Sequence, residues 1–155
     1  MSLDRCQGFL EALALLNGEA SDLCAIYEMV GLPEAPDLPT ALGLRVEDAA
    51  LNVISPAREL AAPLWQIATA PCDSAQLIAV CQRWFFSSQH MQAAPDGGFR
   101  ANLTTAFIEL LEDALAGYTM HTVTMTPPMW YAIHWDEIAF ERGSDRYLLH
   151  FSHSD

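Results

Sequence analysis

The hydrophobic pattern of the sequence changes at Gly117, and this change constrains the fold more than any other feature. Before Gly117, apolar residues recur with the spacing of amphipathic helices. After Gly117, Thr, Val and aromatic residues become frequent, and these residue types favour strands. The sequence therefore predicts an α+β fold, in which an N-terminal bundle of about five or six helices precedes a small C-terminal antiparallel β-meander.

The helical part is expected to cover about residues 1–117. A helix over 101–117 carries one apolar stripe and ends at a glycine cap. A helix over 74–90 begins at Asp73, with Gln76 placed as in a capping box. The other elements expected here are two helices separated by Gly18 (the second ending at Gly31), an ordered loop at 32–44, a short helix at 46–53 and a helix from Ser55 to Pro71.

The β-rich part is expected to cover about residues 118–155, within a single domain of residues 1–155. Strands are predicted at 119–125, 129–142 and 146–153, with a bulge or tight turn near 135–137, where the polar positions change parity. Both faces of 129–135 and of 147–151 are apolar or aromatic. These strands therefore need cover on both faces, from helices or from a partner.

The charge of the chain excludes several classes of protein. It carries 20 acidic residues against seven arginines, a net charge of −13, and no lysine. Schiff-base chemistry and a P-loop need a lysine, so both are excluded. Direct binding to nucleic acid is excluded because nothing could neutralise a run of phosphates. The absence of lysine, together with 23 alanines, is typical of a GC-rich bacterial genome.

The sequence predicts a cytoplasmic protein. Its N-terminal stretch has acidic residues at Asp4 and Glu11 and lacks the basic region of a signal peptide. No apolar run approaches the roughly 18 residues of a membrane span, so no membrane contact is expected. In a cytoplasmic chain the four cysteines are expected to be free thiols, with Cys72 the most exposed.

No catalytic motif and no cofactor motif occurs in the sequence. Four of the five histidines lie in the β-rich part, which raises an alternative: a metal-binding or hydrolytic enzyme domain centred on His134, Asp136, His150 and His153. Strand geometry weakens this alternative, because residues three apart, such as His150 and His153, face opposite sides of a sheet. We therefore expect histidines on a half-exposed sheet, no metal, and no enzyme.

The leading hypothesis is protein–protein binding. An acidic surface attracts basic proteins, and aromatic residues are enriched in interface cores. The specific form expected is an inhibitor or immunity-type protein that neutralises a basic toxin or a basic nucleic-acid-binding protein. A structural subunit of a homo-oligomer, such as a homodimer, is the remaining alternative. The expected partner contacts are Glu109, Glu112, Asp113, Trp130, Trp135, Asp136, Glu137 and Glu141.

Overall fold

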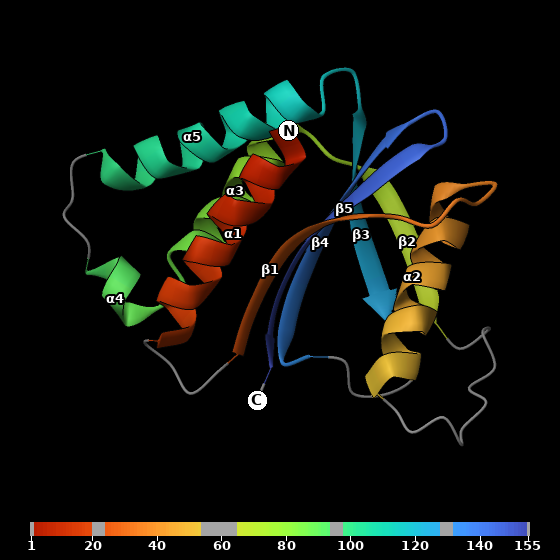
Figure 1. The fold of residues 1–155 in the computed structure, drawn as a ribbon, viewed down its shortest axis with the longest axis horizontal. Helices are drawn as coiled ribbons and strands as arrows, with labels where there is room; N and C mark the ends of the chain where they lie inside the picture. Colours follow the sequence, from red (N-terminus) through yellow and green to blue (C-terminus); the bar gives the residue numbers. More distant parts are fainter. Residues whose placement is uncertain (1, 20–23, 54–64, 94–97, 128–131, 155) are drawn as a thin grey trace.

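The computed structural model of the chain describes residues 2–19, 24–53, 65–93, 98–127 and 132–154 (Figure 1). The elements, in chain order, are α1 (Ser2–Glu19), β1 (Cys24–Gly31), α2 (Leu38–Val53), β2 (Gln66–Pro71), α3 (Ser74–Phe85), α4 (Gln89–Gln92), α5 (Phe99–Ala114), β3 (Thr119–Thr126), β4 (His134–Arg142) and β5 (Asp145–Ser154). Two strands therefore lie among the helices, and three strands follow them.

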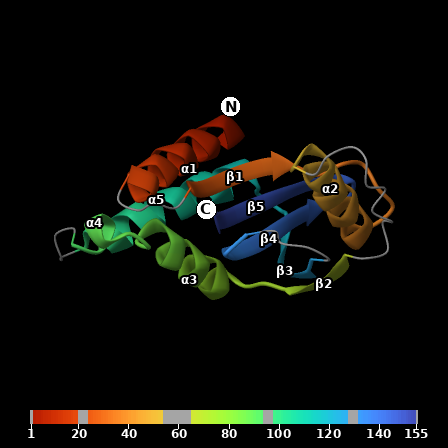
Figure 2. The ribbon, with the colours of Figure 1, turned by 90° about the horizontal axis from the view of Figure 1, so that it is seen from below.

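The five strands form one antiparallel sheet with the order β1-β5-β4-β3-β2. The last strand, β5, lies inside the sheet between β1 and β4, whereas β1 and β2 are the two edges. Figure 2 shows β1 at one margin of the sheet, beside α1. Helices α1, α3 and α5 pack on one face of the sheet, and α2 packs on the other.

The predicted bundle of five or six helices is wrong, although the α+β class holds. Residues 24–31 and 66–71, expected to be helical, are the edge strands β1 and β2. Four helices are long, and α4 has only four residues. The C-terminal strands β3, β4 and β5 are therefore not a separate meander but the three central strands of a larger sheet.

Strand β1 was misread because its apolar residues fit two periods at once. Ile26, Tyr27 and Val30 have helical spacing, but Tyr27 and Met29 are the buried positions of an alternating pattern. Pairing along the whole of β5 decides between the two patterns. Strand β2 ends at Pro71, which an edge strand tolerates because its outer N–H groups need no partner. Residues 55–64 of the predicted helix lie outside the described residues.

Two smaller expectations also fail. Residues 38–44 are not loop but the beginning of α2, which Asp37 caps by accepting a 2.8 Å hydrogen bond from the Thr40 N–H. No bulge lies at 135–137, because β4 and β5 pair without interruption from His134↔His153 to Arg142↔Asp145. The acidic residues there simply alternate between the two faces of the sheet.

Helices α3 and α5 lie where their periodicity places them. Asp73 and Gln76 form the expected capping box at the start of α3, with hydrogen bonds of 2.8 and 2.9 Å. In α5, Phe107 and Leu111 of the predicted stripe are buried. Gly117 follows this helix with a positive φ of 81°, which glycine adopts without steric cost.

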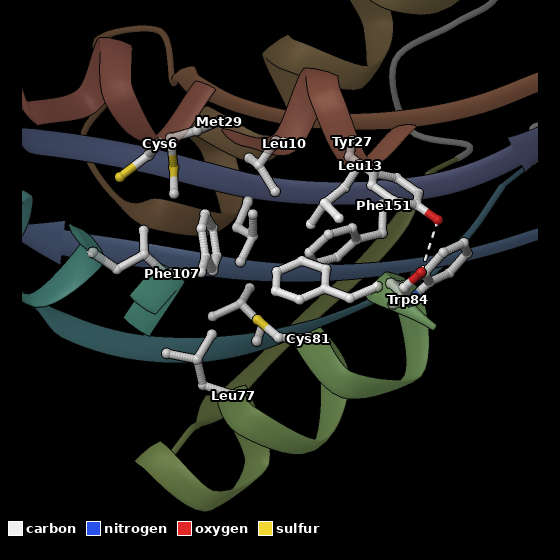
Figure 3. Packing of buried hydrophobic residues seen from close by; sticks show 14 of the residues in the cluster. Cys6, Leu10, Leu13, Tyr27, Met29, Leu77, Cys81, Trp84, Phe107 and Phe151 are labelled. Carbon is white, nitrogen blue, oxygen red and sulfur yellow. Dashed lines mark hydrogen bonds between the residues drawn. The ribbon is translucent and has the colours of Figure 1, made fainter. Parts of the chain in front are cut away.

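The main core lies between the sheet and the layer of α1, α3 and α5 (Figure 3). Phe151 of β5 stacks on Trp84 at 5.7 Å between ring centroids and meets Tyr27 edge-on at 5.2 Å. The Tyr27 hydroxyl donates a 2.9 Å hydrogen bond to the Trp84 carbonyl, drawn as the dashed line in Figure 3. Burial raises the pKa of Tyr27 to about 12.

A smaller core covers the opposite face of the sheet. Leu38 and Leu42 of α2 pack there against Ala139 and Leu148, which adjoin the main-core residues of β4 and β5 in sequence but point the other way. Helices thus supply cover on both sides of these two strands. This is one of the two sources of cover that the two-sided apolar pattern required.

The four thiols are free, but their exposure differs from the expectation. Cys6 and Cys81 are buried, and burial raises the pKa of both. Cys72 is half-buried, and the exposed thiol is Cys24, at the start of β1. The difference at Cys24 follows from the local structure, since this residue begins an edge strand in a segment that was expected to be helical.

Candidate functional site

The three acidic residues predicted on α5 lie on its exposed side. Glu109, Glu112 and Asp113 are all exposed, and no ion pair between described residues involves them. Their role in partner binding stays a prediction.

The acidic residues of β4 do not form one cluster. Asp136 points to the layer of α1, α3 and α5, where its Oδ2 accepts 2.6 Å hydrogen bonds from Trp84 Nε1 and from the Arg83 guanidinium. Glu137 and Glu141 point to the opposite face. Glu141 Oε1 accepts a 2.6 Å hydrogen bond from Arg146, whose guanidinium also donates to the Ala35 carbonyl.

Of the two tryptophans expected as interface anchors, Trp135 lies within the described residues. Trp135 is half-buried on β4, on the same face as Glu137. Trp130 lies outside the described residues. The predicted contact set is thus distributed over α5 and over both faces of β4, and no single surface contains all of it.

The histidines of the alternative metal site also separate. His134 and His153 are direct cross-strand partners on β4 and β5. His153 lies edge-on to the Trp84 ring at 4.8 Å between centroids, and burial lowers its pKa, with a smaller contribution from nearby His134. His150 points to the opposite face. Within the described ranges, no group of three or more His, Cys, Asp or Glu residues could hold a metal ion.

A buried polar chain of three residues, which the sequence pattern alone hardly indicates, lies on the α2 side of the sheet. Glu137 Oε1 and His150 Nδ1 are 3.0 Å apart, and His150 Nε2 is 2.9 Å from Ser152 Oγ. All three residues are buried. The spacing of His150 and Ser152 on one strand was readable from the sequence, but the position of Glu137 opposite His150 depends on the strand register.

A groove runs along the open edge of β1. It has a volume of about 710 Å³ and lies between α1 and β1. Among its lining residues, Leu15 is 69% exposed and Ile26 is 41% exposed, so two large apolar side chains are exposed at the groove. Glu11 contributes a carboxylate to the wall. The one sequence sign of this groove is that Leu15 falls outside the apolar stripe of its helix.

The helix that forms one wall of the groove is held firmly at its C-terminal end. The Asn17 side-chain amide donates to the carbonyls of Leu13, Trp84 and Phe85 at 3.1 to 3.4 Å. The side-chain oxygen of Asn17, Oδ1, accepts a 3.1 Å hydrogen bond from the Ser88 N–H. Because Asn17 is buried, these bonds fix the last turn of α1 against the end of α3.

The helices of the described chain include none that is long and apolar enough to cross a membrane. This agrees with the absence of a long apolar run in the sequence.

The architecture is that of an α+β protein with a five-stranded antiparallel sheet and helices on both faces. No family model and no curated protein matches the sequence. Two crystal structures of citrus MAF1, in space groups P3121 and C2221, match the fold. The first has a TM-score of 0.50 and 13% identity, covering 99% of each chain. The second has a TM-score of 0.41 and 13% identity, covering 99% of this chain and 98% of that one.

At 13% identity, the similarity to the first citrus MAF1 structure concerns the fold alone. A shared fold does not carry a shared activity, since function depends on particular sites. The function of this chain has therefore to be argued from its own surface.

Proposed function

We propose that this protein works by binding another protein, and that the partner is basic. The observation that carries this proposal is the groove beside the β1 edge, in which Leu15 and Ile26 are exposed. Large apolar side chains exposed together beside an unpaired strand edge are typical of protein-binding surfaces. The net negative charge of the chain supports a positively charged partner.

Charge also argues for a different protein as partner rather than a second copy. Each copy carries a net charge of −13, so two copies repel one another. Residues 1–31, which include both walls of the groove, hold five acidic residues and one arginine. A basic protein gains from this field, which raises its association rate and is weakened by salt.

The specific form we propose is an inhibitor that covers the basic surface of its target. The exposed acids Glu109, Glu112 and Asp113 on α5 would extend the negative field beyond the groove. In such an inhibitor the apolar groove supplies most of the affinity, because fully desolvated anchors dominate binding energy. The exposed acids supply mainly speed and selectivity.

The Leu15→Arg variant is expected to lose the partner, whereas Leu16→Arg is expected to keep it. Leu16 is also exposed, at 43%, but it does not line the groove, so the pair of variants adds the same charge at neighbouring sites. Arginine at position 15 removes an apolar contact and repels a basic partner. We expect about a tenfold or greater loss of affinity. Immobilised wild type and variants are exposed to native cell extract, and bound proteins are quantified by mass spectrometry.

Three outcomes of that experiment are informative. A basic protein retained by wild type and Leu16→Arg, depleted on Leu15→Arg and weakened by salt, supports the proposal. Equal capture by all three proteins contradicts it. Capture of this same chain, with a dimeric mass in solution, replaces the basic partner by a second copy. A triple variant of Glu109, Glu112 and Asp113 to Arg then tests α5: unchanged affinity removes that helix from the interface.

A second candidate function, hydrolysis by a nucleophilic serine, is favoured by one specific observation. Glu137, His150 and Ser152 are bonded in the order carboxylate, imidazole, hydroxyl. With a proton on Nδ1, His150 donates to Glu137, and its Nε2 can accept the proton of Ser152. However, Ser152 is only 4% exposed, so a substrate would have to displace whatever covers it. We therefore rank this function below protein binding.

A fluorophosphonate probe separates the two functions. If Ser152 is a nucleophile, its Oγ bonds to the phosphorus of the probe, fluoride leaves, and His150 takes the hydroxyl proton. The expected result is one covalent adduct on Ser152, absent from the Ser152→Ala variant, measured by peptide mass spectrometry. Because we regard the hydrogen bonds among Glu137, His150 and Ser152 as structural, we expect no adduct on the native protein. Stoichiometric labelling of Ser152 would reverse our ranking.

A further inference from the structure

The register between β1 and β5 shows which backbone groups of β1 point out of the sheet. The Leu32 N–H donates to the Arg146 carbonyl at 2.9 Å, so even-numbered residues of this segment bond toward β5. Antiparallel pairing alternates, so the N–H and C=O groups of odd-numbered residues point to the open edge. The Met29 N–H confirms this, because it donates to Gln7 Oε1 of α1 at 2.8 Å rather than to β5.

Gln7 limits the length of open edge. Its amide oxygen occupies the Met29 N–H, and its amide nitrogen donates to Glu11 at 2.9 Å. The outward N–H groups of Ala25 and Tyr27 remain, and no hydrogen bond between described residues engages them. These two groups border the groove, which Ala25 and Tyr27 both line. The free edge is therefore short and lies beside the exposed apolar residues.

Natural edge strands usually carry a device that prevents pairing with another chain, such as lysine, proline or a bulge. Strand β1 contains no lysine and no proline, and its pairing with β5 continues without a bulge from Cys24 to Gly31. Its one charged residue, Glu28, forms a 3.0 Å ion pair with Arg45. An edge without such protection, next to an apolar groove, has the properties of a strand-binding site.

We propose that an extended basic segment of the partner binds in this groove as a sixth strand, paired to Ala25 and Tyr27. This inference rests on the proposed function and adds the mode of binding. The backbone of the segment supplies the hydrogen bonds. Apolar side chains of the segment contact Ile26, and the side chains that alternate with them lie on the side of α1, beside Leu15. A lysine or arginine faces Glu11, which has no cationic partner among the described residues.

The Ala25→Pro variant tests the backbone bond, with Ala25→Val as its matched control. Proline removes the outward N–H of residue 25 and leaves the bonds to β5 intact, as is usual for proline on an edge strand. Valine keeps the N–H and favours the strand. The probe is a fluorescein-labelled peptide of alternating lysine and valine, seven residues long, measured by anisotropy. We expect about tenfold weaker binding to Ala25→Pro than to Ala25→Val, and weak binding of a glutamate–valine peptide.

Two measurements on wild type test the same inference without any substitution. The lysine–valine peptide is expected to slow hydrogen exchange at the Ala25 and Tyr27 amides, while the Ile26 and Glu28 amides, already bonded to β5, change little. It is also expected to protect the exposed thiol of Cys24, which lines the groove, from alkylation. Buried Cys81 serves as the internal reference.

The outcomes distinguish the binding mode from the proposed function. Equal affinity for Ala25→Pro and Ala25→Val, with unchanged exchange at Ala25 and Tyr27, overturns strand addition, and so does a peptide that fails to bind wild type. If Leu15→Arg still loses the cellular partner in that case, the groove binds protein in another way. If Leu15→Arg keeps the partner, the proposed function itself is wrong.

Discussion

Replacing Phe151 with alanine is expected to remove about 3 to 5 kcal/mol from the free energy of unfolding. Phe151 is fully buried at the centre of the main core, where it contacts Trp84, Tyr27 and Phe85 with ring centroids 5.2 to 6.2 Å apart. Truncation leaves a cavity that three rigid rings cannot fill. For a chain of this length the loss corresponds to a fall in Tm of about 10 °C.

The matched control for this prediction is Phe99→Ala. Phe99 lies at the start of α5, is 42% exposed and meets Phe86 at 6.5 Å between centroids. The same chemical change there should cost about 1 kcal/mol, since less apolar area is lost and water can fill the space. Urea unfolding followed by tryptophan fluorescence measures both. Equal losses for the two variants would contradict the assignment of Phe151 to the centre of the core.

The second large effect is expected for His150→Ala. Its ring touches Glu137 on one side and Ser152 on the other, all within a buried layer. Alanine leaves the Glu137 carboxyl buried without this partner, and removing one member of a buried ionisable pair costs about 3 to 5 kcal/mol. Ser152→Ala removes only the terminal hydroxyl, so about 1 kcal/mol is expected for it.

One outcome of comparing His150→Ala with Ser152→Ala would contradict the predicted stability contribution of the buried polar chain. If both variants unfold at the wild-type urea concentration, the polar chain makes no net contribution to stability. The double variant His150→Ala, Glu137→Leu offers a further check. Removing both partners should recover part of the loss, since no carboxyl then stays buried.

The sequence predicts well those helices whose amphipathic pattern and capping signals agree. In α3, the capping residues Asp73 and Gln76 and the buried stripe all indicate one helix. In β1, local pattern alone cannot decide, because its apolar positions satisfy two periods and only β5 selects one of them. Strand β2 has an even weaker local signal, and its pairing with β3 makes it a strand.

The candidate sites were harder to predict, since they depend on which elements become neighbours. The two-residue turn after Arg142, with Gly143 at a positive φ of 62°, sets the register that brings Glu137 opposite His150. The turn was predicted, but a bulge was also expected, and a bulge would have shifted that register. The groove needs α1 to lie along β1, while the segment that became β1 was expected to be helical.

The position of β5 has a consequence for how the chain acquires its structure during synthesis. Because β5 lies between β1 and β4, the first strand made has no neighbour in the sheet until the last strand has left the ribosome. Tyr27 then pairs with Phe151 from the opposite end of the chain, so the sheet closes by a contact of very long sequence separation. Nascent chains that stop before Ser154 should therefore hold an unfinished sheet, which chaperones that recognise exposed strands would bind.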